Sequence, residues 1–279
     1  MGRGRIRAIL AALRLPGVQA LRSAAPGMPL WRALAGLLVV TVLLSVSAAP
    51  PAAAAEAGPL APATPLERRL HQWPAWKLPA PLARPGHQAP AWPIWFKGTW
   101  LVESETLSMD PAMPPQPNPP WQARFRPDGR GGAVAERAFN ACSVGRSLLG
   151  ERLLSVQDDP ANPQRQLARL AGDLLLETTL IGQRGETPEP ERFLNDELSL
   201  QVLHGPGEPR VSRIETLGRW RLLVDGSIAA EQWQARYPSP SEGLAATPLS
   251  SDHWRLRLVP VPPGSDHATG TAAPAAGCR

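Results

Sequence analysis

The stretch that decides the fold is residues 94–100, Ile-Trp-Phe-Lys-Gly-Thr-Trp. It opens a long region in which apolar and polar residues alternate, so Gly98 and Trp100 fall at the start of the first strand of a β domain. A glycine there lets backbone segments pass close to each other, and a tryptophan two residues later fills the end of a small barrel. The stretch therefore predicts an antiparallel barrel that Gly98 and Trp100 close at one end.

Alternation with a period of two continues through most of the chain. Trp121–Arg126 and Trp254–Val259 have the pattern of half-buried strands, whereas residues 193–203 fit a strand or a helix equally well. Asp225-Gly226 separates two apolar runs and predicts a hairpin. The other candidate strands are 133–141, 153–157, 166–170, 174–182, 211–223 and 228–237.

These candidates predict a mainly β fold, an antiparallel barrel of about 8–10 strands. A sandwich has a similar strand count, but a series of sequential hairpins favours an up-and-down barrel, in which closure removes both sheet edges. The first and last strands are then neighbours. By alternation, Trp100 shares a face with Val102, and Leu256 lies on the face of the last strand opposite Arg255 and Arg257.

The early Gly-Thr-Trp together with arginines on the last strand resembles lipocalin-like (calycin) barrels. In those barrels an arginine of the last strand packs across the tryptophan of the first. By that resemblance, Arg255 or Arg257 stacks on Trp100 as a cation–π pair, and Gly98 belongs to the same closure. An ordinary core position for Trp100 is the alternative.

The first 55 residues have the layout of a secretory signal. They carry six arginines and no acidic residue, and residues 33–49 are apolar and uncharged. A basic start, an apolar centre and an Ala-x-Ala end are the parts of a cleavable signal. We therefore predict a signal over residues 1–55, cleaved near Ala54 or Ala55, with Met28 as the alternative true start. An uncleaved anchor is the other open interpretation.

Residues 56–93 form a leader rich in proline and tryptophan. Residues 50–93 hold 11 of the 34 prolines, which excludes a sheet interior because proline lacks a backbone donor. Thr64-Pro65-Leu66-Glu67 combines an N-cap, a proline at the first helical position and a capping-box glutamate, and predicts a short helix. Because Trp73 and Trp76 are too apolar for a free linker, we expect the leader to dock on the domain surface or cover a barrel mouth. A flexible spacer is the alternative.

The predicted β domain spans residues 94–261, and residues 262–279 have the composition of a disordered tail. Cys142 follows a candidate strand, and Cys278 lies in that tail. We expect two free thiols, with Cys142 a small buried apolar residue. A disulfide is the alternative, since exported proteins can form one.

The formal charge of +5 comes from the signal. Without its six arginines, 23 of the 29 basic residues remain against 24 acidic residues, a net charge of −1. The mature chain therefore has no basic excess, and its composition argues against nucleic-acid binding.

A second candidate site lies in residues 136–150, where Arg137, Asn140, Ser143 and Arg146 have the spacing to converge on an anionic or carbonyl group at a barrel mouth. A strand followed by a turn with solvated arginines is the alternative. Together with inward-facing aromatic residues, this site gives the candidate ligand-binding residues Trp100, Phe125, Arg137, Asn140, Arg146 and Trp233.

Motifs for metal binding and catalysis are missing from the sequence. The five histidines are scattered, and no His-x-x-x-His or Cys-x-x-Cys occurs, so no metal site is predicted. Neither Gly-x-Ser-x-Gly nor a phosphate-binding loop occurs. We therefore propose no catalytic residues and leave the cofactor open.

Eight stretches taken together carry a family resemblance: Trp76–Leu82, Pro93–Trp100, Ala135–Asn140, Ser143–Arg146, Asp159–Arg165, Glu177–Gly182, Arg213–Thr216 and Gln232–Trp233. They resemble an uncharacterised family of cyanobacterial and chloroplast proteins that are predicted to lie in the thylakoid lumen or the periplasm. The resemblance spans nearly all of residues 73–260 and implies that compartment and a fold type, but no established activity. Residues 89–92 lack the acidic residue and tyrosine usual in the family. Cys142 stands where Thr or Ser is frequent, which argues against a catalytic or disulfide role for this thiol.

Three hypotheses about function follow. The first is an exported, non-enzymatic lipocalin-like barrel that binds a hydrophobic ligand such as a lipid, pigment or cofactor. The second is an accessory or assembly factor for a photosynthetic (thylakoid) membrane complex, with the Trp-Pro leader and the arginine-rich strand faces as contact surface. An enzyme is the third, although no acid–base constellation supports it. Membrane contact is expected only through the signal or by peripheral association.

Overall fold

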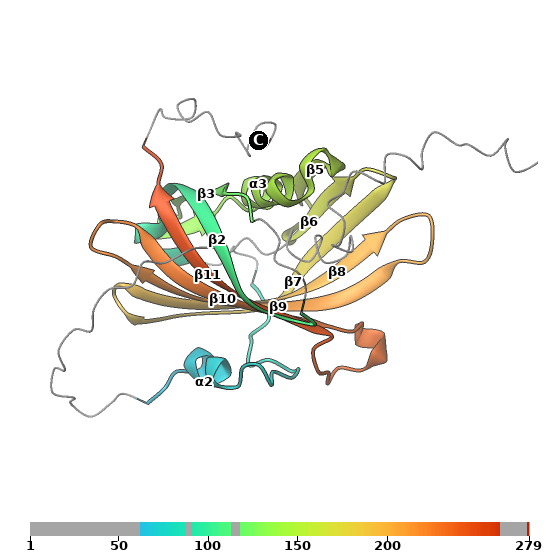
Figure 1. Ribbon diagram of the computed structural model, residues 1–279, viewed down its shortest axis with the longest axis horizontal. Coiled ribbons are helices and arrows are strands. Elements are labelled where there is room, and N and C mark those ends of the chain that lie inside the picture. The colour runs from blue at the N-terminus through green and yellow to red at the C-terminus, as the bar shows by residue number, and fades with distance from the viewer. Residues whose placement is uncertain (1–61, 87–90, 113–117, 263–277, 279) are drawn as a thin grey trace, which may run out of the picture.

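The computed structural model describes residues 62–86, 91–112, 118–262 and 278. Within these ranges, eleven antiparallel strands form one curled sheet, a half-barrel, in the order β1-β4-β3-β2-β11-β10-β9-β8-β7-β6-β5 (Figure 1). The strands are β1 (Trp92–Pro93), β2 (Gly98–Asp110), β3 (Trp121–Pro127), β4 (Gly132–Ala135), β5 (Leu153–Asp159), β6 (Asn162–Leu170), β7 (Leu174–Glu189), β8 (Arg192–His204), β9 (Arg210–Leu222), β10 (Ile228–Tyr237) and β11 (Ser250–Pro260). The helices are α2 (Pro65–His71) and α3 (Arg137–Leu149), with 3-10 turns η2 (Ile94–Phe96), η3 (Gly150–Arg152) and η4 (Pro240–Glu242).

The mainly β prediction is confirmed, and the sheet is open where a closed barrel was expected. Strands β5 to β11 form an up-and-down meander, and β11 returns to pair with β2, so that Val102 lies opposite Leu258. The predicted adjacency of first and last long strands is therefore confirmed. Closure fails at β1 and β5, which are the two ends of the strand order.

Helix α3 occupies the gap that strand pairing leaves open. Residues 133–141 were expected to be one strand, but the strand β4 ends at Ala135 and the helix begins at Arg137. The helix contacts β3 and β5 and lies across the concave side of the sheet (Figure 1). It therefore connects β5, the strand at one edge of the half-barrel, with β3 near the other edge.

Two polar side chains of α3 bind the exposed backbone edge of β3. Asn140 accepts a hydrogen bond from the Arg124 amide at 2.6 Å and donates one to the Arg124 carbonyl at 3.0 Å. Three residues later, Ser143 accepts a bond from the Gln122 amide at 2.9 Å. Because residues three apart share a helix face, this pair replaces the neighbouring strand that β3 lacks there.

Asn140→Ala is therefore expected to lower the free energy of unfolding by about 2 kcal/mol, since the Arg124 amide loses its partner and the Arg124 carbonyl keeps only the bond from the Glu136 amide. Urea unfolding measures the change. Ala138→Ser, a change at a partly exposed position of the same helix, is the control and should cost less than about 0.5 kcal/mol. Equal losses in both variants would show that Asn140 does not support the strand edge.

The two faces of the sheet bury different apolar clusters. On the concave face, one cluster gathers around Trp100 and Trp220, and a second lies between α3 and the β5–β8 strands around Leu176. On the convex face, a third cluster joins the leader to the sheet and includes Trp76 and Tyr237. Figure 1 shows α2 on the side of the sheet opposite α3.

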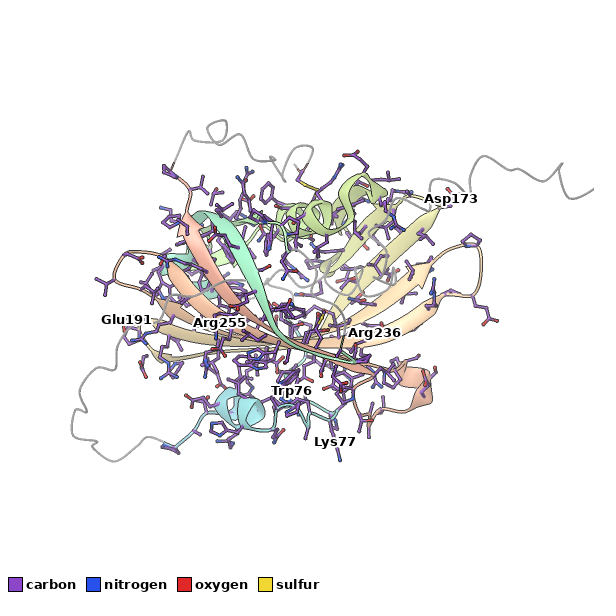
Figure 2. All side chains as sticks on the ribbon, in the orientation of Figure 1. Trp76, Lys77, Asp173, Glu191, Arg236 and Arg255 are labelled. Atoms are coloured by element: carbon purple, nitrogen blue, oxygen red, sulfur yellow. A yellow bond between two sulfur atoms is a disulfide. The ribbon has the colours of Figure 1, made fainter. Side chains whose placement is uncertain are left out.

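The leader docks on the convex face. The predicted capping box at Thr64 is confirmed: its side chain accepts from the Glu67 amide, and α2 follows. Trp76 and Leu78 are 1% and 5% exposed, and Figure 2 shows Trp76 between the leader and the sheet. Beyond them, Ala83 pairs with Gln183 on the part of β7 that extends past β6. The chain then reaches Trp92 in the first concave cluster.

The two cysteines form a disulfide, so the expectation of two free thiols is wrong. Cys142 on α3 is joined to Cys278, with a Cα–Cα distance of 5.7 Å and a sequence separation of 136. Cys142 is buried, as expected, and Cys278 packs against the same cluster. The composition of the tail led to the expectation of free thiols. Such a composition does not prevent Cys278 from bonding to Cys142. The predicted signal and most of the predicted tail lie outside the described residues.

Candidate functional site

The predicted ligand-binding residues do not converge on one site. Trp100 and Phe125 are buried in the first concave cluster, where the Trp100 indole donates to the Phe96 carbonyl at 2.6 Å. Trp233 lies on the convex face and stacks on His253, with ring centroids 4.7 Å apart. Whether any of them binds a ligand stays a prediction.

The predicted stacking of Arg255 or Arg257 on Trp100 does not occur among the described contacts. Pairing of β2 with β11 places Arg255 opposite Glu105, and the two side chains form an ion pair at 2.9 Å. Arg257 pairs with Asp225 at 2.7 Å. Both arginines therefore point to the convex face, whereas Trp100 points to the concave one. The alternation of each strand already implied this separation.

The candidate residues on α3 have three different roles. Asn140 holds β3, as described above. Arg146 lies near Glu151, at 3.7 Å, and donates weakly to the Leu154 carbonyl at 3.5 Å. Arg137, at the first turn, has a buried Nη1 with no hydrogen-bond partner. The Nε of Arg146 is likewise buried without a partner, so both arginines keep an unused donor in the described structure.

A pocket of about 380 Å³ lies where the leader crosses from the convex to the concave side. We call it the leader pocket. Its walls come from three segments: leader residues 83–84 and 91–92, part of β7 and the beginning of β8. Trp92 and Phe193 give it an aromatic side, and Gln183, Asn195 and Glu197 give it a polar one. Its volume is in the range of small-molecule sites.

Two polar groups of the leader pocket differ in their hydrogen bonding. Asn195 accepts a 2.6 Å bond from the Trp220 indole, and Gly218 leaves room for it, since a Cβ there would lie 2.8 Å from the Asn195 oxygen. In contrast, the Gln183 side-chain oxygen is buried and has no partner. A buried unpaired acceptor is rare in native proteins and calls for a donor from elsewhere.

Polar side chains continue from the leader pocket across the concave face. On β8 the inward positions read Phe193, Asn195, Glu197, Ser199, Gln201 and Leu203, apolar at the ends and polar in the middle. Directly opposite partners share a face, so Gln201 adjoins Thr178, and Glu197 adjoins Thr216, which adjoins Gln234. We use the name polar belt for the polar side chains of this group and Gln232, which are Thr178, Glu197, Gln201, Thr216, Gln232 and Gln234.

The polar belt is buried but unsatisfied. One side-chain atom in each of five residues has no hydrogen-bond partner, although every one of these residues is at most 5% exposed. A polar group buried without a partner costs about 1–3 kcal/mol, so water or a ligand is expected to satisfy them. The five residues are Thr178, Gln201, Thr216, Gln232 and Gln234.

Glu197 and Arg137 are the charged groups of this interior. Burial raises the pKa of the Glu197 carboxyl, and the positive charge of Arg137 on α3 lowers it in part. The structure gives no ion pair between the two described side chains. A raised pKa lets a carboxyl group remain protonated and donate a hydrogen bond, as a ligand carbonyl or ether oxygen would require.

A second buried polar cluster lies on the convex face beneath the leader. Arg69 of α2 donates two hydrogen bonds to the Glu215 carboxylate of β9, at 2.7 and 2.8 Å, and Tyr237 donates to the same carboxylate at 2.6 Å. Burial and the charge of Glu215 raise the pKa of Tyr237. Burial, and next Glu215, raise the pKa of the neighbouring Asp196 well above its usual range, while Arg69 lowers it in part.

The convex cluster anchors the leader. The Arg69 guanidinium also donates to Gln72 and to the Lys77 carbonyl, and the Trp76 indole donates to the Arg69 carbonyl at 2.8 Å. These bonds join the leader to itself and to β9. Since Arg69 and Glu215 are 4% and 0% exposed, we interpret the cluster as a structural joint.

The described residues contain no group of three or more His, Cys, Asp or Glu side chains placed to hold a metal ion. In the same part of the chain, no helix is long and apolar enough to cross a membrane.

Sequence reasoning missed Gln183, Glu197 and the polar belt. Residues 193–203 fitted a strand or a helix equally well, so the sequence assigned none of their side chains to a face of the sheet. In the structure Leu194 and Leu198 face the leader on the convex side, and Glu197 lies on the other face of β8. A strand covered on both faces does not reveal from its pattern which side holds a site.

Comparison with known proteins identifies the family of the chain. A family model described as "Domain of unknown function (DUF6816)" matches residues 86–254, which include the whole polar belt and the leader pocket except for Ala83 and Arg84. Comparisons with curated proteins and with solved structures found no match. Because the match covers more than half of the chain, from the end of the leader to β11, the protein belongs to the DUF6816 family.

Proposed function

We propose that this protein is an exported, lipocalin-like binding protein of the thylakoid lumen or periplasm that holds a small amphipathic ligand in the leader pocket. The observation that carries the proposal is the set of buried, unpaired polar atoms that begins at Gln183 in the pocket and continues along the belt. The predicted export signal supports the compartment. The half-barrel, with an interior face that α3 covers, supports ligand binding.

The pocket chemistry favours an amphipathic ligand over a purely hydrophobic one. Trp92 and Phe193 offer ring faces and edges for an apolar part. Gln183 offers an acceptor, and Glu197 offers a carboxyl group with a raised pKa, for a hydroxyl, amide or carbonyl group. A ligand with only hydrocarbon would leave these groups unsatisfied, at a cost that grows with each one.

The assembly-factor hypothesis loses the leader as part of its proposed contact surface, whereas the arginine-rich strand faces stay accessible and that part stays a prediction. Trp76 and Leu78 were expected to meet a partner, but both are buried against the chain's own sheet.

Glu197→Leu is expected to weaken ligand binding about 10- to 100-fold, because it removes a buried hydrogen bond to an ionisable group. The measurement is native mass spectrometry, with extraction and absorbance, on the mature protein purified from its own membranes. Wild-type protein should carry a ligand close to one per chain, and the variant should carry little. Glu208→Leu, in an exposed turn, is the control and should keep it.

An empty wild-type protein would contradict the proposal if a crystal structure also showed the pocket and belt filled only by ordered water. The melting temperature of Glu197→Leu separates loss of binding from loss of fold. Replacement of a buried polar group by an apolar one of similar size should not lower the stability of the ligand-free protein.

A further inference from the structure

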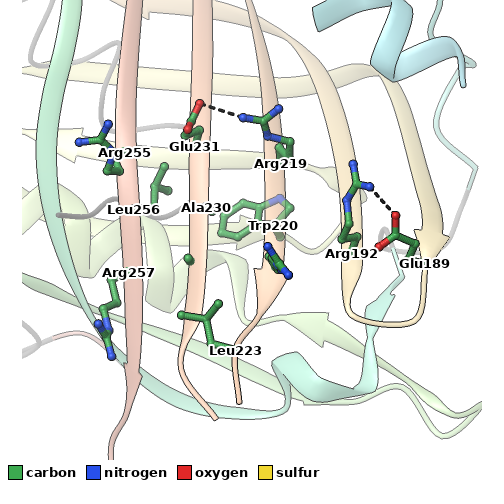
Figure 3. A pocket seen from close by; sticks show the side chains of 12 residues that line it. Glu189, Arg192, Arg219, Trp220, Leu223, Ala230, Glu231, Arg255, Leu256 and Arg257 are labelled. Atoms are coloured by element: carbon green, nitrogen blue, oxygen red, sulfur yellow. Dashed lines mark hydrogen bonds and ion pairs between the residues drawn. The ribbon is translucent and has the colours of Figure 1, made fainter. Parts of the chain in front are cut away.

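Five arginines gather at one end of the convex face, around a hollow of about 620 Å³ (Figure 3). This end carries the β7–β8 and β9–β10 turns. Figure 2 shows Glu191 and Arg255 at this end, with Asp173 at the opposite end of the sheet. We call the group the arginine rim: Arg192, Arg219, Arg221, Arg255 and Arg257.

Strand register explains the hollow. Arg192 lies directly opposite Arg221, and Arg221 lies opposite Ala229, whose other neighbour is Arg257. The small side chain of Ala229 leaves a gap between two arginines that are two strands, about 10 Å, apart. Like charges placed directly opposite each other are unfavourable, so Arg192 beside Arg221 favours the presence of an anion close to Arg221.

Arg221 is the free cation of the rim. In the part of the chain that the structure describes, it has no carboxylate within ion-pair distance and is exposed. The other four pair with carboxylates, for example Arg219 with Glu231 at 3.1 Å, and Arg257 with Asp225 at 2.7 Å. Exposed pairs of this kind contribute about 0–1 kcal/mol, so an incoming anion can compete for them. The Nε of Arg257 is buried and has no partner.

Exposed apolar side chains surround the rim at the same end. Val224 projects fully from the β9–β10 turn, and Val259 lies near the end of β11. Ile94 is 47% exposed in η2, and the neighbouring Trp95 indole donates to the Pro190 carbonyl of the β7–β8 turn. Anionic lipid surfaces attract such a combination, because the apolar side chains insert into the interface and the arginines are drawn to the negative lipid charge.

We propose that this end of the half-barrel binds the surface of an anionic phospholipid bilayer. A lipid phosphate sits over Ala229 between Arg221 and Arg257, whose guanidinium groups match phosphate oxygens in pairs. Val224 enters the interface beside it. The hollow at the rim and the leader pocket share no lining residue, so this surface is separate from the proposed ligand site.

The test is sedimentation of the mature protein with vesicles of phosphatidylcholine alone, or of phosphatidylcholine and phosphatidylserine in equal parts. Only the anionic vesicles should bind. Arg221→Gln with Arg257→Gln should weaken partitioning about fivefold for each arginine removed. Val224→Ser should weaken it severalfold without a change in net charge or melting temperature. The matched control is Arg169→Gln with Arg210→Gln, two exposed arginines at the opposite end, and should bind like wild type.

Three results would overturn the proposal. Wild-type protein that ignores anionic vesicles excludes a lipid surface. Equal weakening by the control pair shows general charge attraction without a site. Binding of inorganic phosphate through Arg221, without vesicle binding, assigns the rim to a soluble phosphate compound. If the double arginine variant fails to fold, Val224→Ser decides alone, because its side chain makes no buried contact.

Discussion

Arg69→Met is expected to lower the free energy of unfolding by about 3–5 kcal/mol, because it leaves a buried carboxylate without its cation. Glu215 is fully buried, and both of its oxygens accept from the Arg69 guanidinium. Methionine fills a similar volume but supplies no donor and no charge. Asp196, already close to a carboxylate, also loses the cation that lowers its pKa. Urea unfolding of the mature protein measures the change.

The loss should depend on pH in a defined direction. Without Arg69, the pKa of Asp196 in the folded protein rises further above the unfolded value of about 4, because the charge that lowers it in part is gone. The folded variant then holds protons that the unfolded chain releases, so its stability falls as pH increases above that value. The deficit relative to wild type should therefore be larger at pH 8 than at pH 5. Arg68→Met, at the exposed neighbouring position, is the control and should cost less than about 0.5 kcal/mol at both pH values. A deficit that grows on acidification would contradict the role of Arg69 as the counter-charge.

The joint around Arg69 shows which part of the leader was predictable. Thr64-Pro65-Leu66-Glu67 is a local signal, and the helix that it predicts is present. Docking followed from the tryptophans, since Trp76 is too apolar to remain in water. The partner of Arg69 was not predictable, because Glu215 is 146 residues away and faces the leader only through the register of β9.

The strands were predictable because their signals lie between neighbours in sequence, whereas α3 was not predictable. Alternation and the Asp225-Gly226 turn depend on neighbours in sequence, and the structure has β9, β10 and β11 where they indicated. In α3, the residues Asn140, Cys142, Ser143 and Gly145 are all weak helix formers. Tertiary contacts decide this segment: the side chains that disfavour a helix bond to the β3 edge or pack in the core. Propensity therefore favoured a strand where packing produced a helix.

The candidate site depends on whether the sheet closes into a barrel, and a single sequence does not determine this. Gly98 and Trp100 do begin the first long strand, and β2 does meet β11. An open sheet, however, exposes an inner face to α3 and the leader, and the leader pocket exists only because the leader crosses at β7. Gln183 is part of the pocket because the leader crosses there, and its neighbours in sequence do not indicate this role.

Opening the Cys142–Cys278 disulfide is expected to lower the free energy of unfolding by about 2–5 kcal/mol. The bridge closes a loop with a sequence separation of 136, long enough that the chain-entropy estimate lies at the upper end of that range. Cys278→Ser is the better variant, since Cys278 is only partly buried, whereas a change at Cys142 would also disturb the core. Urea unfolding of oxidised and reduced wild-type protein gives the first measurement. The variant should match reduced wild type and should not respond to reductant.

The location of the bridge makes a further distinction possible. Cys142 lies on the helix that spans the open side of the half-barrel, and it packs in the cluster between that helix and strands β5 to β8. Reduction should therefore raise amide hydrogen exchange in α3 more than in β9 and β10, which are paired on both sides. A count of two reactive thiols in the unreduced, denatured protein would restore the original expectation of free cysteines. A uniform increase in exchange would show that the bridge stabilises the whole chain through its unfolded state, as the loop-entropy argument alone requires, and does not hold α3 in particular.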